Sequence, residues 1–226
     1  GGMLIGAASY HPLARRPTFR RLEDTLSLDD LLVELQQPEV KATILAEENL
    51  PPDPHRQYES LAENAPFLWG SVFPLGDPPD YEPLPEASIA GVASATGRDP
   101  FEVFYDHLAA GELLLGAFTN YTQGNEDHLA EMITDPNTVI GLSDGGAHVK
   151  MICDASAPTY LLTHWVRDRS RGPRLPLEYA VKRLTLDPAE LYGLGDRGVL
   201  APGQRADVNV VDFDRLALRY PERVTD

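Results

Sequence analysis

Along the first part of the chain, apolar residues recur with the spacing that is typical of helices. Ser27-Leu28-Asp29-Asp30 supplies a capping residue and an acidic first turn, and apolar residues recur at helical spacing through Leu35. Pro38 suits the first turn of a further helix, which we expect to run toward Leu50. Proline-rich breaks follow, so this stretch predicts helices joined by loops.

The middle of the chain repeats one scheme twice. Asp99-Pro100-Phe101-Glu102 combines a cap, a proline and an acid in the order that opens a helix, with an expected end near Gly111. Residues 112–118 then form a short apolar run of the length of a buried strand. A helix over 125–134 and an apolar run over 138–142 repeat this order. Helix, strand, helix, strand predicts an α/β fold with a parallel sheet.

The last part of the chain changes character near residue 196. A helix over 156–169 is predicted, followed by helices over 176–184 and 188–192. Apolar residues occupy one face of the first of these at Leu161, Leu162, Trp165 and Val166. Beyond Asp196, turn residues surround alternating valines, which predicts β structure. We therefore expect one body over 1–195 and a separate β segment over 196–226.

Composition narrows the classes of partner. The chain has 226 residues, 42% of them hydrophobic, and a net charge of −16, so it can form a core but offers little to neutralise a polyanion. We expect no binding to nucleic acid or to membranes, since no apolar run approaches the ~18 residues of a membrane helix. Cys153 is the one cysteine, and the first residues lack the features of a signal peptide, so a cytoplasmic location is expected.

The segment around Asp144 carries the clearest candidate chemistry. An apolar strand would deliver its carboxylate at the carboxyl end, where active sites of parallel α/β folds lie. Such an aspartate can bind a metal and accept a proton from a metal-bound water, since the ion lowers the pKa of that water. The alternative is a glycine-rich turn whose aspartate only caps the next element. If the site is real, we expect substrate contacts from its neighbours, namely Ser143, Gly145, Gly146 and His148.

Other residues are candidates by position. His11 follows a strand-like run and precedes two arginines, so either a loop at a barrel mouth or a structural role fits it. Asn120 and Tyr121 follow the predicted strand over 112–118, where substrate contact and turn chemistry are equally compatible with the pattern. His164 lies in an amphipathic helix and is interpreted as a packed helix histidine.

Motifs that are typical of other functions also occur in the chain, but their surroundings do not support those functions. Residues 193–198 fit G-x-G-x-x-G, but a helix precedes them and a strand is predicted after them, the reverse of a dinucleotide site. Cys153 has no recognisable histidine and asparagine partners for nucleophilic catalysis, so it is interpreted as a buried apolar residue. Asn120-Tyr121-Thr122 is formally a glycosylation sequon without a secretory signal.

An ordered set of motifs resembles the amidohydrolase superfamily and, more narrowly, N-acyl-D-amino-acid deacylases. The opening Gly2-Met3-Leu4-Ile5-Gly6 with Tyr10-His11-Pro12 is similar to an earlier barrel strand of such enzymes. The motifs of the second half are Ser143-Asp144-Gly145, Thr163-His164-Trp165-Val166-Arg167, Leu177-Glu178-Tyr179-Ala180-Val181, Gly193-Leu194-Gly195-Asp196-Arg197-Gly198 and Gly203-Gln204-Arg205-Ala206-Asp207-Val208.

The resemblance implies the C-terminal part of a (β/α)8 barrel, with the start of a small β-sandwich at the end of the chain. It implies a zinc-dependent hydrolase of linear amides that removes the acyl group from N-acyl-D-amino acids. Asp144 matches the aspartate of the last barrel strand, which in that family contacts the metal and acts as general acid and base. The chain has no His-x-His pair and offers one matching ligand where zinc needs three or four. Residues 152–156 also replace the family's His-Pro-Arg segment, which leaves the substrate open.

Two further hypotheses remain beside this one. The chain alone can be a truncated, non-catalytic fragment or binding module that lacks most metal ligands. Alternatively, the same scaffold can carry another amidohydrolase reaction, such as cyclic-amide hydrolysis or deamination. The enzyme hypotheses share a small-molecule substrate, and the apolar strand edges of a partial barrel predict self-association.

Overall fold

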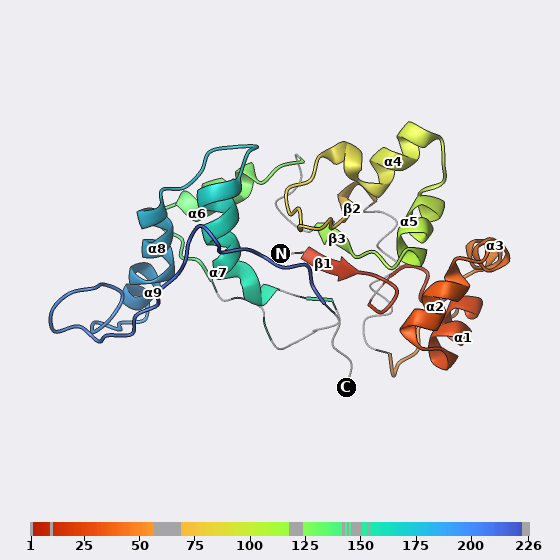
Figure 1. Cartoon of the computed structure of the whole chain (residues 1–226), viewed down its shortest axis with the longest axis horizontal. Coiled ribbons are helices and arrows are strands. Elements are labelled where there is room, and N and C mark those ends of the chain that lie inside the picture. The colour runs from red at the N-terminus through yellow and green to blue at the C-terminus, as the bar shows by residue number, and fades with distance from the viewer. Residues whose placement is uncertain are drawn as a thin grey trace. The chain divides into compact units, whose positions relative to one another are not determined.

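The chain divides into two compact units. In a computed structural model, the described residues are 2–9, 11–56, 69–117, 124–141, 143, 145, 151–152 and 154–222. The first unit comprises Gly1–Gly124 and Gly146–Ile152, and the second comprises Asn125–Gly145 and Cys153–Asp226. Figure 1 labels the helices and strands of both. The expected change of domain at residue 196 stays a prediction.

A three-stranded sheet forms the centre of the first unit. β3 (Leu114–Ala117) lies between β1 (Gly2–Ile5) and β2 (Val72–Pro74) and is antiparallel to both. Gly2 pairs with Ala117, and Val72 pairs with Gly116. The strand predicted over 112–118 is therefore present, but the parallel pairing expected for it is wrong. An apolar run shows that a strand is buried and does not encode the direction of its neighbours.

The outer edges of this sheet are partly protected. Pro74 lies in the edge strand β2, where a residue without an amide proton removes no ladder bond from a central strand. On the other edge, the amide of Leu4 donates to the carbonyl of Met151 at 2.8 Å. This bond attaches residue 151 to β1.

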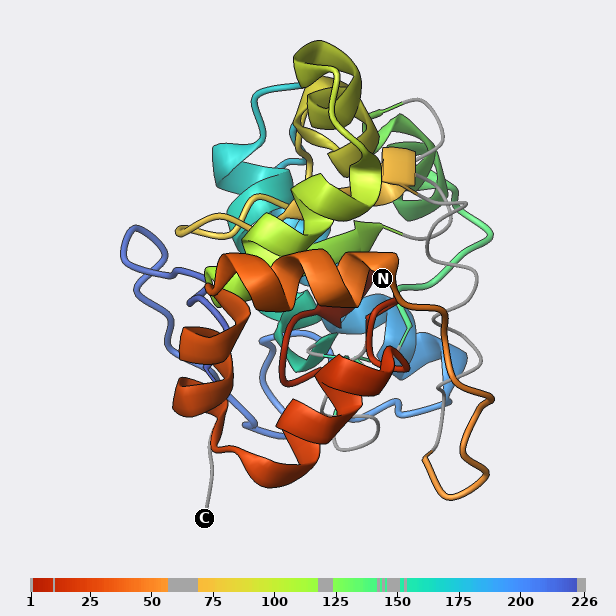
Figure 2. The same ribbon diagram turned by 90° about the vertical axis from the view of Figure 1, so that its right-hand side faces the viewer.

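Within the described residues, the first unit also contains six helical segments. They are α1 (Pro17–Thr25), α2 (Leu28–Leu35), α3 (Pro38–Ala46), the short 3-10 helix η2 (Pro85–Ala87), α4 (Ile89–Thr96) and α5 (Pro100–Ala109). α1, α2 and α3 contact one another, and both α2 and α3 contact α5 (Figure 2). The predicted helix starts are confirmed: the side chain of Ser27 accepts from the amide of Asp30, and the side chain of Asp99 accepts from that of Phe101. After α5 the chain turns at Gly111, whose φ of 73° suits glycine.

α3 stops at Ala46, earlier than the predicted end near Leu50, because Glu47 serves a different helix. Its backbone is extended, with φ −74° and ψ 155°. Its carboxylate accepts from the amide of Thr18 at 3.0 and 3.2 Å and from the Thr18 hydroxyl at 2.6 Å. Thr18 lies in the first turn of α1, where amides have no partner within the helix, so Glu47 caps α1 from 29 residues away.

The core of the first unit lies between these helices. Phe19, Phe104 and Tyr105 are almost completely buried, and Leu35 is buried beside them. The Tyr105 hydroxyl donates to the carbonyl of Leu35 at 2.9 Å, which joins α5 to the end of α2. Burial raises the pKa of Tyr105, since the charged phenolate is disfavoured in this core.

The second unit is helical. Its elements are α6 (Asp127–Thr134), the 3-10 turn η3 (Asp154–Ser156), α7 (Ala157–Tyr160), the π-helix η4 (Leu161–Asp168), α8 (Leu177–Leu184) and α9 (Leu186–Leu191). The predicted helices over 125–134, 156–169, 176–184 and 188–192 are thus confirmed, with ends shifted by a few residues. Leu161 and Trp165 form the buried face of η4 as expected, and they belong to one buried cluster with Leu175 and Ala180. Among the described residues, no helix has the length and hydrophobicity to cross a bilayer.

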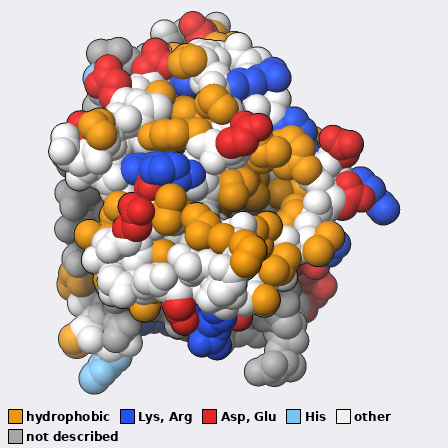
Figure 3. Space-filling model, turned by 90° about the vertical axis from the view of Figure 1, so that its left-hand side faces the viewer, with side chains coloured by type: hydrophobic (Ala, Val, Ile, Leu, Met, Phe, Trp, Pro, Cys, Tyr) orange, Lys and Arg blue, Asp and Glu red, His pale blue; other side chains and the backbone are white. Residues whose placement is uncertain are grey.

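The described residues of two predicted β segments form no paired strand. Residues 138–141 and 196–222 contain no paired strand, and the side chain of Val210 is 96% exposed. A strand needs a neighbour for its amides and carbonyls, and the alternating valines show only that the segment suits a sheet. Figure 3 looks onto the α8–α9 side of the second unit and shows hydrophobic side chains gathered around a hollow. Exposed apolar residues of this unit include Leu177, Val181, Leu191, Val199, Leu200, Val208 and Val210.

Arg167 anchors part of the irregular C-terminal segment. Its guanidinium donates to the carbonyl of Phe213 at 2.6 Å and to that of Leu216 at 2.9 Å, while Asp168 accepts two further bonds from it. The Arg167 side chain holds the pKa of Asp168 below its usual range. η4 therefore fixes residues 213–216 without any strand pairing.

Replacing Glu47 with alanine tests its role as the cap of α1. Loss of the charged acceptor leaves the Thr18 amide without its partner, so the free energy of unfolding should fall by about 1–2 kcal/mol. Urea denaturation measures the change. Glu48→Ala is the matched control, because Glu48 is exposed and adjacent, and it should shift stability by less than about 0.5 kcal/mol. Equal effects of the two substitutions would contradict the capping role.

Candidate functional site in the second unit

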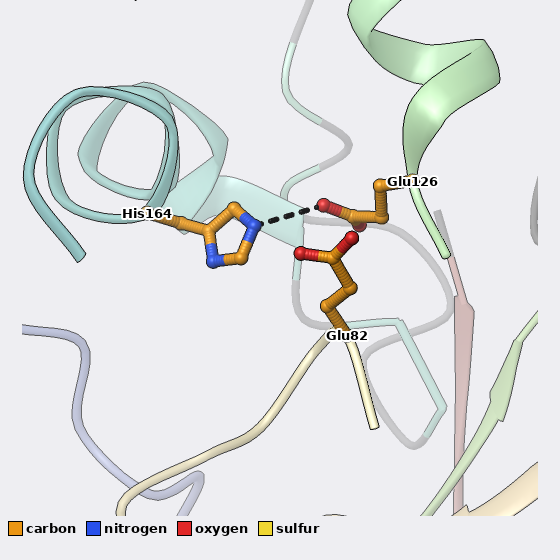
Figure 4. Close-up of side chains that lie close together, drawn as sticks. All are labelled: Glu82, Glu126 and His164. Carbon is orange, nitrogen blue, oxygen red and sulfur yellow. Dashed lines mark ion pairs between the residues drawn. The ribbon is translucent and has the colours of Figure 1, made fainter. Parts of the chain in front are cut away.

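Glu126, Tyr160 and His164 bring three polar side chains together in the second unit. The Tyr160 hydroxyl donates to Glu126 Oε2 at 2.8 Å, and His164 Nε2 lies 3.1 Å from the same oxygen. Figure 4 shows the imidazole of His164 and the carboxylate of Glu126 pointing toward each other. The side chain of Glu126 is 7% exposed and that of His164 is 17% exposed. A carboxylate and an imidazole this close form an ion pair when the ring is protonated.

The local sequence explains how the two aromatic side chains meet. Tyr160 and His164 are four residues apart on one continuous helical run, so they lie on the same face. Their rings stack with centroids 4.7 Å apart and an angle of 12°. The helix widens here, since the amide of Arg169 donates to the carbonyl of His164 five residues earlier. π-type turns are rare and frequently lie at functional sites.

A buried arginine fixes the neighbouring face of this helix. The guanidinium of Arg169 lies 4.6 Å from the ring centroid of Trp165 and donates to Asp127 Oδ1 at 2.9 Å. Its side chain is fully buried, and it also donates to the carbonyl of Pro173 at 3.2 Å. Adjacent acids at the start of α6 thus bind the same helix at two points, Glu126 at Tyr160 and His164, and Asp127 at Arg169.

A second buried arginine holds the approach to Ser143 and Asp144. Arg183 of α8 donates to the carbonyl of Thr138 at 2.6 Å and to its hydroxyl at 2.9 Å. It also donates to Asp187 at 3.1 Å. The hydrogen bonds from Lys182 and then Arg183 hold the pKa of Asp187 below its usual range, so this carboxylate stays charged. The segment that leads toward Asp144 is therefore held at Thr138 by α8 rather than by a strand partner.

Two of the residues predicted around Asp144 are described. Ser143 is half-buried and Gly145 is exposed. A Cβ at Gly145 would lie 3.2 Å from Cβ of Ala155, so the chain passes close to η3 at this point. Asp144, Gly146, His148, Asn120 and Tyr121 lie outside the described residues, and their roles stay predictions.

His11 lies in the core of the first unit. Its ring is 4.4 Å from that of Phe19 in an edge-on arrangement and 6.3 Å from that of Phe104. The residue is 1% exposed, and within the described part of the chain neither ring nitrogen has a hydrogen-bond partner. Burial lowers the pKa of His11 to about 3, because the charged imidazolium is disfavoured among apolar groups. The imidazole is therefore neutral at physiological pH, and a substrate contact from it stays a prediction.

The sequence singled out His164 only as a packed helix histidine, and Glu126 was missed. The structure confirms the helix but gives His164 a buried carboxylate as neighbour. The available signal was the spacing of Tyr160 and His164, combined with two consecutive acids before an apolar helix at 126–127. Neither feature shows that Glu126 contacts Tyr160 and His164, because these residues are 34 or more positions away from it in the sequence.

Comparison with known proteins assigns the family. The model of the amidohydrolase family matches residues 8–226, nearly the whole chain. The chain belongs to the amidohydrolase family. No solved structure matches it. The family implies a fold related to the (β/α)8 barrel, and the described residues of this amidohydrolase chain contribute helices and one small sheet.

Curated relatives of this amidohydrolase chain are much longer than the matched region. Uncharacterized proteins of Mycobacterium tuberculosis and Mycobacterium bovis are each 33% identical over 132 residues, which is 57% of this chain and 21% of each relative. An adenine deaminase of Methanoregula boonei is 55% identical over 38 residues, or 17% of this chain and 7% of that protein. The matched part thus spans about a fifth of the mycobacterial relatives.

The buried His11 predicts a loss of stability in mild acid. Its pKa is about 3 in the folded chain and about 6.5 in the unfolded chain, so between these values only the unfolded state takes up the proton. The stabilising effect of the neutral ring is complete above pH 6.5 and decreases as the pH falls toward 3, by about 2 kcal/mol at pH 5. His11→Leu should remove this part of the pH dependence in urea denaturation at pH 7, 6 and 5. His55→Leu, at an exposed histidine, is the control, and equal slopes for wild type and His11→Leu would refute the assignment.

Gly172 is predicted to be essential for the position of Arg169. A Cβ at residue 172 would lie 2.5–2.6 Å from three guanidinium atoms, which cannot move aside because Asp127, Pro173 and Trp165 hold them. Gly172→Ala should destabilise the second unit by about 1–3 kcal/mol. Thermal unfolding followed by tryptophan fluorescence measures this. Gly195→Ala is the control, since nothing lies within 4 Å of its added Cβ, and an equally stable Gly172→Ala would show that Arg169 is not confined.

Proposed function

We propose that the protein is a metal-dependent hydrolase of non-peptide carbon–nitrogen bonds, with N-acyl-D-amino acids as its substrates. The observation that carries the proposal is the family match over residues 8–226, which includes the Ser143-Asp144-Gly145 segment. Membership of the family supports hydrolysis assisted by a metal. The choice of linear N-acyl amides rests on the motifs of the second half of the chain, which resemble N-acyl-D-amino-acid deacylases.

Asp144 is the proposed general acid and base. Its carboxylate accepts a proton from the attacking water and delivers it to the leaving amine, so that the acyl group departs as a carboxylate. The hold of Arg183 on Thr138 supports this role, since it fixes the chain six residues before Asp144. We propose that seven residues contact the substrate, namely Ser143, Gly145, Gly146, His148, His11, Asn120 and Tyr121.

Zinc is the proposed metal, with Asp144 as one ligand. When bound, the ion supplies a positive charge that polarises the amide carbonyl. The described residues include donors of suitable chemistry, because Glu126 and His164 present a carboxylate oxygen and an imidazole nitrogen in a largely buried setting. Those two donors are fewer than the three or four that zinc sites use, so further ligands are required.

The proposed architecture is the C-terminal part of a (β/α)8 barrel over 1–195 and a partial β-sandwich over 196–226. The exposed valines of the last segment support the second assignment, since they suit a sheet that needs neighbouring strands. The same exposed apolar surface supports self-association. A cytoplasmic location belongs to the same proposal, and the single cysteine, which permits no internal disulfide, supports it. A truncated, non-catalytic module is the competing proposal for this chain on its own.

Deamination is a second candidate reaction within the same family. The short match to an adenine deaminase favours it over cyclic-amide hydrolysis. Both deacylation and deamination attack a carbon bonded to nitrogen with water. They differ in the leaving group, which is an amino acid in the first case and ammonia in the second.

Asp144→Asn in the natural protein tests the proposed function. Asparagine keeps the size of the side chain but cannot accept the proton, so amine release from N-acyl-D-amino acids should fall at least a hundredfold. The panel includes N-acyl-L-amino acids, a cyclic amide and adenine, with free amine and ammonia measured separately. Asp29→Asn, at an exposed residue of α2, is the control and should keep full activity.

The outcomes separate the candidates. Release of ammonia from adenine alone would replace deacylation with deamination. Retained turnover in Asp144→Asn would end the acid–base role of Asp144. The 226-residue chain is assayed beside the natural protein, with its metal content measured, and turnover by the chain itself would refute the competing proposal of a non-catalytic module.

A further inference from the structure

We infer that Thr138 is a positioning residue for the segment that carries Asp144, which rests on the proposed role of Asp144 as general acid and base. Residues 138–141, 143 and 145 of this segment are described, and Asp144 follows Ser143 in the sequence. The segment through Gly145 belongs to the second unit, and so do the two helices that hold Thr138, α6 and α8.

The end of α6 binds Thr138 from one side. After α6 a tight turn returns the chain, and the amide of Thr138 donates to the carbonyl of Asp135 at 3.2 Å. The Thr138 hydroxyl donates to the carbonyl of Met132 at 2.6 Å. Met132 lies in the last turn of α6, where carbonyls have no amide partner within the helix. Thr138 therefore caps the carboxyl end of α6.

α8 binds the same residue from another side. The buried guanidinium of Arg183 donates to the Thr138 carbonyl at 2.6 Å and to its hydroxyl at 2.9 Å. Asp187, which is also buried, accepts from Arg183 at 3.1 Å and so fixes the guanidinium. The one hydroxyl thus accepts from α8 while it donates to α6. Only a hydroxyl can do both here, because an apolar side chain of the same shape offers neither a proton nor a lone pair.

The rest of the segment is held without strand pairing in its described residues. Ile140 packs against the buried cluster that contains Leu161 and Trp165. Further along, a Cβ at Gly145 would lie 3.2 Å from Cβ of Ala155, so the chain passes close to η3. A barrel strand would be fixed by a ladder of backbone hydrogen bonds, whereas this segment depends on a few contacts. Its course toward Asp144 therefore depends on the first of them, at Thr138.

A shift at Thr138 is expected to cost rate rather than substrate affinity. A misplacement of about 1 Å in a catalytic group can lower the rate about a hundredfold. Thr138 is not among the residues proposed to contact the substrate, so its loss should leave KM nearly unchanged. A purely structural role would instead lower stability and leave the kcat of the folded protein as it is.

Thr138→Val in the natural protein tests the positioning role. Valine keeps the shape but removes the hydroxyl, so kcat for the best substrate of the panel should fall about tenfold or more, with KM changed less than about twofold. Thr138→Ser keeps the hydroxyl and should retain most of kcat. Thr134→Val is the matched control, because the hydroxyl of this exposed threonine donates to the carbonyl of Ala130 within α6, and it should keep full kcat.

Two further measurements separate positioning from a general loss of stability. Adding Thr138→Val to Asp144→Asn should not lower the residual turnover further, since Thr138 acts only through Asp144. Hydrogen exchange, which requires no turnover, should become faster at the amides of residues 139–145 in Thr138→Val and stay unchanged in Thr134→Val.

The outcomes distinguish this role from the proposed function. Full kcat in Thr138→Val, an equal loss in Thr134→Val, additive losses in the double variant, or unchanged hydrogen exchange would each overturn the positioning role. If the wild-type protein turns over no substrate of the panel, the proposed function fails instead. In that case hydrogen exchange still decides whether Thr138 holds the segment.

Discussion

Two adjacent carboxylates at the start of α6 hold the second unit together. Glu126 meets Tyr160 and His164, and Asp127 meets Arg169, so α6 is joined to the helical run over 154–168 at two consecutive positions. The Glu126 carboxylate and the Arg169 guanidinium are both buried, and burying a charge is costly unless it finds a partner of opposite charge or a hydrogen bond. Here the partners lie on one continuous helical run and its C-terminal cap, and the two contacts fix the position of that helix along α6.

The elements with local signals could be predicted from the sequence. α2 and α5 begin where Ser27 and Asp99 cap them, because a cap, a proline and first-turn acids act within four residues. The helices of the second unit follow from apolar spacing for the same reason. The end of α3 could not be predicted, since Glu47 leaves that helix to bind Thr18, which is 29 residues away.

Features that depend on partners were harder to predict. Apolar runs indicated strands at 112–118 and 138–142, yet only the first has neighbours among the described residues, and they run antiparallel. The candidate site divides in the same way: a glycine-rich turn after an apolar run drew attention to Asp144, while the pairing of Glu126 with His164 depends on tertiary packing. The sequence also does not show that a given histidine is buried, although His11 and His164 both are largely buried in the structure.

Arg167 holds residues 213–216 by hydrogen bonds to backbone carbonyls, those of Phe213, Asp214 and Leu216. Every residue type has a backbone carbonyl, so most of these hydrogen bonds do not depend on the side chains of residues 213–216. Homologous chains can therefore diverge at positions 214–216 and still be anchored in the same way, provided that the arginine on η4 is kept. Evolutionary constraint at this contact should therefore be much stronger on Arg167 than on residues 214–216.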